Sequence, residues 1–216
     1  MSLLREDRNG RVALLTRNLV PGTKVYNEDL VLRGGVEYRT WDPFRSKLAA
    51  AIIKGLPQTV IREGSRVLYL GASTGTTASH VSDLVGKEGV VVGVEFAPRV
   101  AREFVEHVAR VRSNVIPFVM DARDPSKYRV TTVDVVYCDI AQPDQTEIAV
   151  ANCSAMLKAH GSLLLTVKSR SIDVLKDPQK IYSEEAEKLG AAGFNVHAVI
   201  ELSPFEKDHA MIYATS

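Results

Sequence analysis

From Arg66 onward, short apolar runs alternate with amphipathic segments, and this alternation restricts the possible folds more than any other feature of the chain. It predicts seven strands, at 67–70, 90–95, 115–120, 133–138, 163–167, 196–202 and 210–214, with helices near 76–85, 98–111, 145–158 and 180–190. Strands that alternate with helices are typical of an α/β fold, in which a parallel sheet has helices on both faces. The linker 203–209 is too short for a helical crossover, so we expect the last two strands to pair antiparallel at one edge.

The first 40 residues follow a different pattern. Short β-prone runs at 12–15, 24–26, 30–32 and 36–38 are separated by turn residues, which predicts a small antiparallel meander. Asp42 and Pro43 then have the character of an N-cap and a first helical residue, so we expect a helix that starts there and reaches Gly55. We therefore predict a small N-terminal β domain with a linking helix, residues 1–55, and a second domain, residues 56–216.

Composition excludes several classes of protein. With 45% hydrophobic and 25% charged residues the chain is expected to be soluble and globular, and its longest apolar runs are too short to span a membrane. The first eight residues contain acids and no apolar core of a signal peptide, which favours a cytoplasmic protein. Cys138 and Cys153 are interpreted as reduced packing residues, and no metal site is expected.

A glycine-containing turn follows the first strand of the second domain. Gly71 and Gly75 lie between that strand and a predicted helix, where doubly wound folds bind nucleotides. The segment matches neither the Gly-x-Gly-x-x-Gly motif of dinucleotide binding nor a phosphate-binding loop. The turn alone is therefore a weak indication of a ligand.

Acidic residues follow the next three strands and strengthen that indication. Glu95, Asp121 and Asp139 are expected at one edge of the sheet, because the carboxyl ends of parallel strands lie together. Glu95 is placed to accept ribose hydroxyls, Asp121 to accept an exocyclic amine, and Asp139 to hold an ammonium or sulfonium group, while Phe96 offers an apolar face to a purine. Singly, each acid could equally be a helix cap or a solvated carboxylate.

Thr76 and Thr77 open the helix that follows the glycine turn. Their hydroxyls and backbone N–H groups could bind a carboxylate, although threonines in a first turn are also ordinary capping residues. A ligand with an adenine, a ribose, an amine, a carboxylate and a positive sulfur suits this set better than NAD. S-adenosylmethionine is therefore the expected cofactor.

The segment from Gly71 to Asp83, GASTGTTASHVSD, closely resembles the fibrillarin family of guide-RNA-directed 2'-O-methyltransferases. The resemblance continues in order along nearly the whole chain. It includes RSKLAA at 45–50, VEF at 94–96, DAR at 121–123, CDIAQPDQ at 138–145, VK at 167–168 and PFEKDHA at 204–210. The chain lacks a Gly/Arg-rich N-terminal segment, so it resembles the archaeal form.

The resemblance implies a Rossmann-like class I methyltransferase fold: a seven-stranded, mostly parallel sheet with an antiparallel last strand, preceded by a small N-terminal β domain. It implies methylation of ribose 2'-hydroxyls in rRNA, and possibly tRNA, by the catalytic subunit of a box C/D ribonucleoprotein. The expected partners are a box C/D guide RNA with its target RNA, a Nop-type scaffold protein and a kink-turn-binding ribosomal-type protein.

The resemblance also implies a set of site residues. The cofactor contacts would be Gly71, Ala72, Thr76, Thr77, Glu95, Phe96, Asp121, Ala122, Asp139 and Gln142. The catalytic set would be Lys47, Asp139, Lys168 and His209. Lys168 is the favoured residue either to stabilise the developing alkoxide or to accept the hydroxyl proton.

Net charge is only +1, but residues 1–66 hold 12 Lys and Arg against 7 Asp and Glu, so the front of the chain is basic. Lys24, Arg33, Arg39 and Arg45 are candidates to contact RNA backbone or a docking protein. Two alternative functions stay open at this point, a noncatalytic subunit of an RNA–protein particle and a protein glutamine methyltransferase. The missing dinucleotide motif counts against a nicotinamide oxidoreductase.

Overall fold

The computed structural model describes residues 2–8, 11–128 and 131–216 of the chain. Its N-terminal part is a four-stranded antiparallel sheet of order β1-β2-β4-β3, made of β1 (Leu3–Arg8), β2 (Arg11–Arg17), β3 (Leu30–Arg33) and β4 (Val36–Trp41). Strand β1 was not predicted, because its charged sequence LLREDR lacks an apolar alternation. The predicted strand at 24–26 is wrong: the backbone N–H groups of Val25 and Tyr26 donate to the Glu28 carboxylate instead of to a neighbouring strand.

The linking helix starts later than predicted. Helix α1 (Lys47–Ile53) has Ser46 as its N-cap, whose hydroxyl accepts from the N–H of Ala49. Asp42 is not a helix cap, because its carboxylate accepts from the N–H of Phe44 and its carbonyl from the N–H of Arg45, which closes a turn ahead of the helix. This turn places Lys47 at the first helical position.

The second part is a seven-stranded sheet of order β10-β11-β9-β8-β5-β6-β7. Its strands are β5 (Arg66–Leu70), β6 (Val90–Val94), β7 (Val115–Phe118), β8 (Val133–Cys138), β9 (Leu157–Lys168), β10 (Asn195–Glu201) and β11 (His209–Thr215). Strand β11 pairs antiparallel with both β9 and β10, and β5 to β9 pair in parallel. The predicted α/β fold with an antiparallel last strand is confirmed.

The helices of this part are α2 (Thr76–Val85), α3 (Pro98–Phe104), α4 (Gln145–Met156), α5 (Ser169–Ile172) and α6 (Pro178–Ala191). Two short turns complete it, a π-helical one at Val105–Ala109 and a 3-10 one at Pro125–Tyr128. The predicted helix 98–111 is therefore α3 followed by the π-helical turn, and α5 was not predicted. Strand β9 begins six residues earlier than predicted, because residues 157–162 have no continuous apolar run and three of them, residues 158–160, are exposed.

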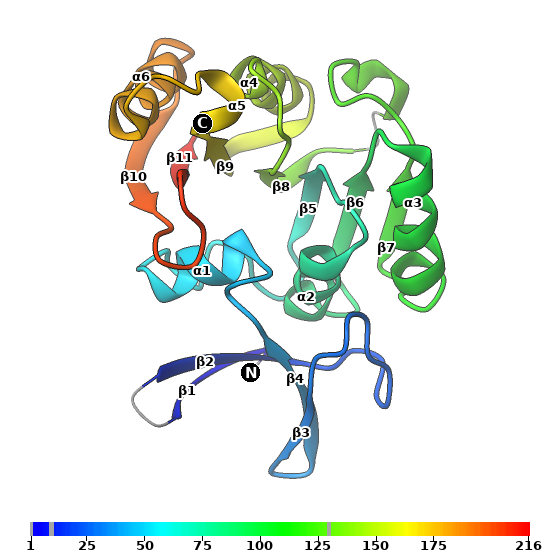
Figure 1. Ribbon diagram of the computed structural model, residues 1–216. Helices are drawn as coiled ribbons and strands as arrows, with labels where there is room; N and C mark the ends of the chain where they lie inside the picture. Colours follow the sequence, from blue (N-terminus) through cyan, green and yellow to red (C-terminus); the bar gives the residue numbers. More distant parts are fainter. Residues whose placement is uncertain (1, 9–10, 129–130) are drawn as a thin grey trace.

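Helices cover both faces of the large sheet (Figure 1). Val67 and Tyr69 of β5 pack with α1, α2 and α3 on one face, whereas Leu68 and Leu70 pack with α4 and α6 on the other. This alternation follows from the two-residue period of a strand. The apolar core on the face that α1 and α2 cover also includes Leu14 and Trp41 of the N-terminal sheet, so the two sheets share this core. The domain division at residue 55 stays a prediction.

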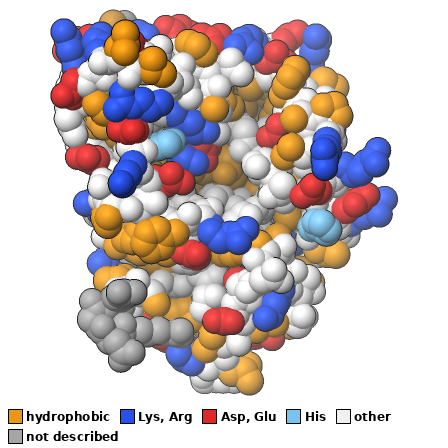
Figure 2. All heavy atoms as spheres, in the orientation of Figure 1, with side chains coloured by type: hydrophobic (Ala, Val, Ile, Leu, Met, Phe, Trp, Pro, Cys, Tyr) orange, Lys and Arg blue, Asp and Glu red, His pale blue; other side chains and the backbone are white. Residues whose placement is uncertain are grey.

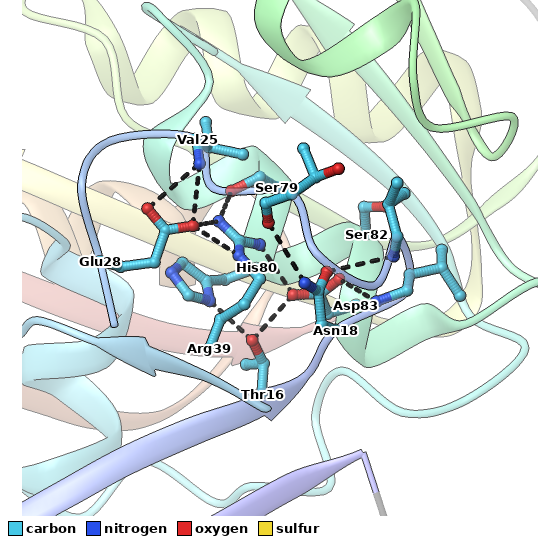
Figure 3. Close-up of polar contacts among 12 residues, drawn as sticks. Thr16, Asn18, Val25, Glu28, Arg39, Ser79, His80, Ser82 and Asp83 are labelled. Carbon is cyan, nitrogen blue, oxygen red and sulfur yellow. Dashed lines mark hydrogen bonds and ion pairs between the residues drawn. The ribbon is translucent and has the colours of Figure 1, made fainter. Parts of the chain in front are cut away.

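A buried polar cluster joins the N-terminal sheet to α2 (Figure 3). Arg39 of β4 is fully buried, and its guanidinium binds Glu28, Asp83 and the hydroxyl of Ser79. Arg112 binds the second oxygen of Asp83, so two buried cations face two buried carboxylates. The candidate role of Arg39 as an RNA contact is therefore wrong, because none of its surface is accessible.

His80 of α2 belongs to the same buried polar cluster and is also fully buried (Figure 3). Its ring stacks on Trp41 at 4.9 Å between centroids, with Nδ1 2.7 Å from the hydroxyl of Thr16 and Nε2 2.6 Å from that of Tyr26. Burial, reinforced by Arg39 and Arg112, holds the pKa of His80 well below its usual value. The imidazole is therefore neutral at physiological pH.

Cys138 and Cys153 are buried and unpaired, and burial raises the pKa of the Cys138 thiol to about 12. Among the residues described, no group of three or more His, Cys, Asp or Glu side chains is placed to hold a metal ion. None of the described helices has the length and apolar character that crossing a membrane requires.

Candidate active site

The glycine turn after β5 is shaped by two close approaches. Gly71 has a φ of 81°, and a Cβ there would lie 2.6 Å from the carbonyl oxygen of Asp139. Gly75 has a φ of 94°, and a Cβ there would lie 2.5 Å from Val108. Only glycine combines this backbone conformation with so little space, so the turn lies directly against the residue that follows β8.

A cavity of about 290 Å³ opens at the carboxyl edge of β5, β6 and β8. It is lined by seven of the ten predicted cofactor residues: Gly71, Glu95, Phe96, Asp121, Ala122, Asp139 and Gln142. Glu95 is fixed on its floor, because its carboxylate accepts from the backbone N–H groups of Ser73 and Ala97 at 2.9 Å each. Phe96 is 69% exposed, which leaves its ring open to a flat ligand.

Arg123 organises the far wall of this cavity. Its guanidinium binds both oxygens of Asp144 and the side-chain oxygen of Gln142, and it lies 3.7 Å from Asp121. The hydrogen bond from Arg123 keeps the pKa of Asp144 below its usual value. Arg123 thus ties the segment after β7 to the segment after β8, and both segments carry predicted cofactor residues.

A second cavity, of about 220 Å³, adjoins the first. The remaining predicted cofactor residues Ala72, Thr76 and Thr77 line it, and Gly71, Ser73, Asp139 and Lys168 are shared by both cavities. The hydroxyl of Thr77 donates to Ser46 at 3.0 Å, so this side chain connects α2 to the cap of α1. Thr76 stands at the start of α2, where the first backbone N–H groups of a helix are free to bind an anion.

Asp139 lies between two lysines at the wall that the cavities share. The ammonium of Lys168 is 3.0 Å from Asp139 Oδ1 and also donates to the Asp139 carbonyl at 3.1 Å, and the ammonium of Lys47 is 3.5 Å from the same carboxylate oxygen. The Lys47 and Lys168 side chains are 19% and 16% exposed, so the group is largely shielded from water yet open to the second cavity. Tyr69 and Tyr137 pack beneath it, and burial together with Asp139 raises the pKa of both phenols.

His209 is the first residue of β11 and pairs in register with Lys168 of β9. Directly opposed residues of an antiparallel pair point to the same face of the sheet, so the imidazole lies beside the lysine. Its Nδ1 is 2.6 Å from the carbonyl oxygen of Lys207, and a carbonyl only accepts hydrogen bonds. Nδ1 therefore carries the proton, and in the neutral ring Nε2 is the free acceptor.

The structure thus brings every predicted site residue to one edge of the sheet, although His209 lines neither cavity. The sequence did not identify Ser73 or Arg123 as part of the site, and it indicated Arg45 only as a candidate contact to RNA backbone or a docking protein. Ser73 contributes a backbone group, which no side-chain pattern reveals. The contact of Arg123 with Asp144 spans 21 residues, and sequence spacing does not predict it.

The fold and the site together define a class of protein. The large sheet has seven strands with an antiparallel last strand, a glycine turn follows β5, and acidic residues follow the next strands. These features are those of the S-adenosylmethionine-dependent methyltransferase folds. The residues present suit that cofactor, with carboxylates for the ribose and the cationic groups and an open aromatic face for the base. The chain belongs to the fibrillarin family, whose model it matches over residues 3–216.

Individual relatives agree with this membership. A fibrillarin-like rRNA/tRNA 2'-O-methyltransferase of Sulfolobus acidocaldarius is 54% identical over 206 residues, covering 94% of this chain and 89% of its own. Fibrillarin of Aeropyrum pernix, solved with natively bound S-adenosylmethionine, is 46% identical with a TM-score of 0.88 and coverages of 99% and 98%. Fibrillarin in a complex with Nop5p is 37% identical with a TM-score of 0.87 and coverages of 99% and 96%.

Proposed function

We propose that the protein transfers a methyl group from S-adenosylmethionine to ribose 2'-hydroxyls of rRNA, and of tRNA where a guide RNA directs it. The observation that carries this proposal is the group formed by Lys168, Asp139 and Lys47 on the wall shared by two adjoining cavities. The first cavity has the acids expected for the nucleoside part of the cofactor, and two ammonium groups line the adjoining second cavity, where they can meet an incoming hydroxyl. The fibrillarin relatives support the same activity.

The first cavity is proposed to bind the nucleoside part of the cofactor. Glu95 accepts the ribose hydroxyls, Phe96 packs against the adenine, and Asp121, Ala122 and Gln142 contact its edge. The amino-acid part lies toward Gly71, Ala72, Thr76 and Thr77, where the start of α2 receives the carboxylate. When bound, the cofactor supplies an electrophilic methyl group.

The catalytic group acts on the 2'-hydroxyl. The ammonium groups of Lys168 and Lys47 form ion pairs with the Asp139 carboxylate, and Lys168 also donates to the Asp139 backbone carbonyl. Both lysines act as cations that stabilise the developing alkoxide. Asp139 orients both ammonium groups. The bond from the 2'-oxygen to the methyl carbon forms while the bond from that carbon to sulfur breaks, and the sulfur leaves as a neutral thioether. The hydroxyl proton passes to Nε2 of His209, which is the acceptor nitrogen of the neutral ring because Nδ1 donates to the Lys207 carbonyl.

The proposed partners are a box C/D guide RNA with its target RNA, a Nop-type scaffold protein and a kink-turn-binding ribosomal-type protein. The complex of a 37% identical fibrillarin with Nop5p supports the scaffold partner. With a net charge of +1 and 6% aromatic residues, this chain is poorly equipped to select RNA alone, which supports selection by a guide. A cytoplasmic location accompanies this function.

The test is transfer of radiolabel from S-adenosylmethionine to RNA in the reconstituted complex, followed by alkaline hydrolysis. We expect label in alkali-resistant dinucleotides for the wild type, and none for Lys168→Ala at unchanged cofactor affinity. Lys87→Ala, which removes an exposed lysine beyond the end of α2, serves as the matched control and should retain activity. Label in protein would instead indicate a protein methyltransferase. No label despite assembly and cofactor binding would indicate a structural subunit.

A further inference from the structure

An exposed aromatic ring lies beside the segments that carry two of the catalytic residues. Phe44 is 62% exposed and stands three residues before Lys47. Its ring meets that of Phe205 edge to face, with centroids 5.2 Å apart, and Phe205 stands four residues before His209. The pair therefore joins the turn ahead of α1 to the loop between β10 and β11, which run close together (Figure 1).

Short-range hydrogen bonds hold the backbone at both phenylalanines, and the two rings contact each other. The N–H of Phe44 donates to the Asp42 carboxylate at 2.9 Å, and the N–H of Phe205 donates to the carbonyl of Leu202 at 3.0 Å. Phe205 is half-buried against the core and supports Phe44 from behind. A ring that is already fixed loses little conformational freedom on binding, so Phe44 is preorganised as a contact surface.

Cationic side chains belong to the same two segments as these rings. The exposed guanidinium of Arg45 lies 5.0 Å above the ring of Tyr26, and Arg45 and Lys47 both line the second cavity. Lys207 is exposed in the loop that carries Phe205. Figure 2 shows hydrophobic side chains close to Lys and Arg side chains beside the hollow on this face of the molecule. A polyanion with apolar surface between its charges is complementary to such a patch.

We propose that Phe44, Arg45 and Phe205 form a platform for the target RNA strand, on which the nucleotide next to the methylated one rests. Phe44 packs against the ribose of that nucleotide, and Arg45 binds its phosphate. In a paired strand the faces of the bases are stacked and only sugars, phosphates and base edges are open to a protein. This inference rests on the proposed function and adds a substrate contact to it.

The kinetic test uses the full chain in the reconstituted complex. We expect Phe44→Ala to raise the KM for target RNA about tenfold, the lower end of what burial of an aromatic side chain contributes, at unchanged kcat and unchanged affinity for S-adenosylmethionine. Phe44→Trp should keep the KM near that of the wild type. Leu32→Ala is the matched control, because Leu32 is similarly exposed, at 69%, but lies on β3 of the N-terminal sheet.

Salt dependence tests the phosphate contact separately. Arg45→Ala should reduce the slope of log KM against log salt concentration by about 0.7 to 0.9, the contribution of one phosphate contact. Arg45→Lys should restore most of that slope, because the charge is retained. An unchanged slope in Arg45→Ala would overturn the assignment of Arg45.

Three results would overturn the role of Phe44. An unchanged KM in Phe44→Ala excludes the contact. A lower kcat or melting temperature at unchanged KM means that the aromatic pair only fixes Lys47 and His209. Weaker binding of the purified scaffold protein means that the surface docks protein. A benzophenone amino acid in place of Phe44 gives a readout that needs no methylation: crosslinking to the target strand supports the platform even if the wild type is inactive, and crosslinking to protein overturns it.

Discussion

Replacing Arg39 with methionine tests whether the buried charge cluster determines how firmly the N-terminal sheet is attached. Arg39 is 0% exposed and binds Glu28, Asp83 and Ser79, so its loss leaves two buried carboxylates facing the single cation Arg112. Removing one partner from a buried ion pair costs about 3 to 5 kcal/mol of folding free energy. For a chain of this length each kcal/mol shifts Tm by about 2 to 4 °C, so we expect Arg39→Met to melt about 6 to 20 °C lower.

The assay is thermal unfolding followed by circular dichroism, with two comparison variants. Arg33→Met removes an exposed arginine of the same sheet that pairs with Glu6, and it should leave Tm unchanged. Arg39→Met combined with Glu28→Gln should recover part of the loss, because one unpaired charge is removed with its partner. A Tm for Arg39→Met equal to that of Arg33→Met would refute the reasoning.

The loss of stability in Arg39→Met should also depend on pH. Burial favours the neutral form of Glu28, but Arg39 and the N–H groups of Tyr26 and Val25 outweigh it and lower the pKa of Glu28 in the folded protein. Without Arg39 the carboxyl can relieve its unpaired charge by taking up a proton. The stability difference between wild type and Arg39→Met should therefore shrink as the pH falls from 8 to 5.

The remaining predictions concern single sites. The pKa of His80 is lowered in the folded protein, so the contribution of His80 to stability is complete above the unfolded-state pKa of about 6.5. Below that pH the contribution is lost at up to about 1.36 kcal/mol per pH unit. In urea titrations His80→Gln should therefore show a flatter dependence of unfolding free energy on pH between 6.5 and 5, and an unchanged slope would contradict a buried neutral imidazole. Glu95→Ala should weaken S-adenosylmethionine binding about 10- to 100-fold in calorimetry, because a charged acceptor of the ribose hydroxyls is worth about 1.5 to 3 kcal/mol; unchanged affinity would reject that assignment. Gly71→Ala should lower both Tm and cofactor affinity, since its Cβ would meet the Asp139 carbonyl at 2.6 Å; a normally binding Gly71→Ala would show that the turn can shift freely.

The large sheet was predictable because its strands carry their own signal. Residues 67–70 of β5 are apolar and buried, and they are followed by glycine and then by a helix, so the sequence pattern agrees with the fold. The reversed pairing of β11 followed from a linker that is too short for a crossover. Strand β1 escaped prediction because its pairing with β2 supplies the order that its charged sequence does not indicate.

The site was predictable to the extent that its residues sit at strand ends. Glu95, Asp121 and Asp139 face one cavity because parallel strands end at one edge. Lys47 and His209 come from elements outside that rule, and only the family resemblance indicated them. Arg39 was named as a candidate contact to RNA or a docking protein because the front of the chain is basic; its burial depends on Asp83, which lies 44 residues away.

The four buried charges between the N-terminal sheet and α2 also give this junction its own response to heat. The free energy lost when ions leave water becomes smaller as temperature rises, whereas the stabilisation from apolar burial levels off. The contribution of Arg39, Arg112, Glu28 and Asp83 relative to the apolar core therefore grows on warming. Helix α2 begins at the glycine turn, and Thr77 of α2 donates to Ser46, the N-cap of α1. The position of Lys47 on α1 therefore depends on a junction whose ion pairs gain in relative strength at temperatures where apolar packing no longer does.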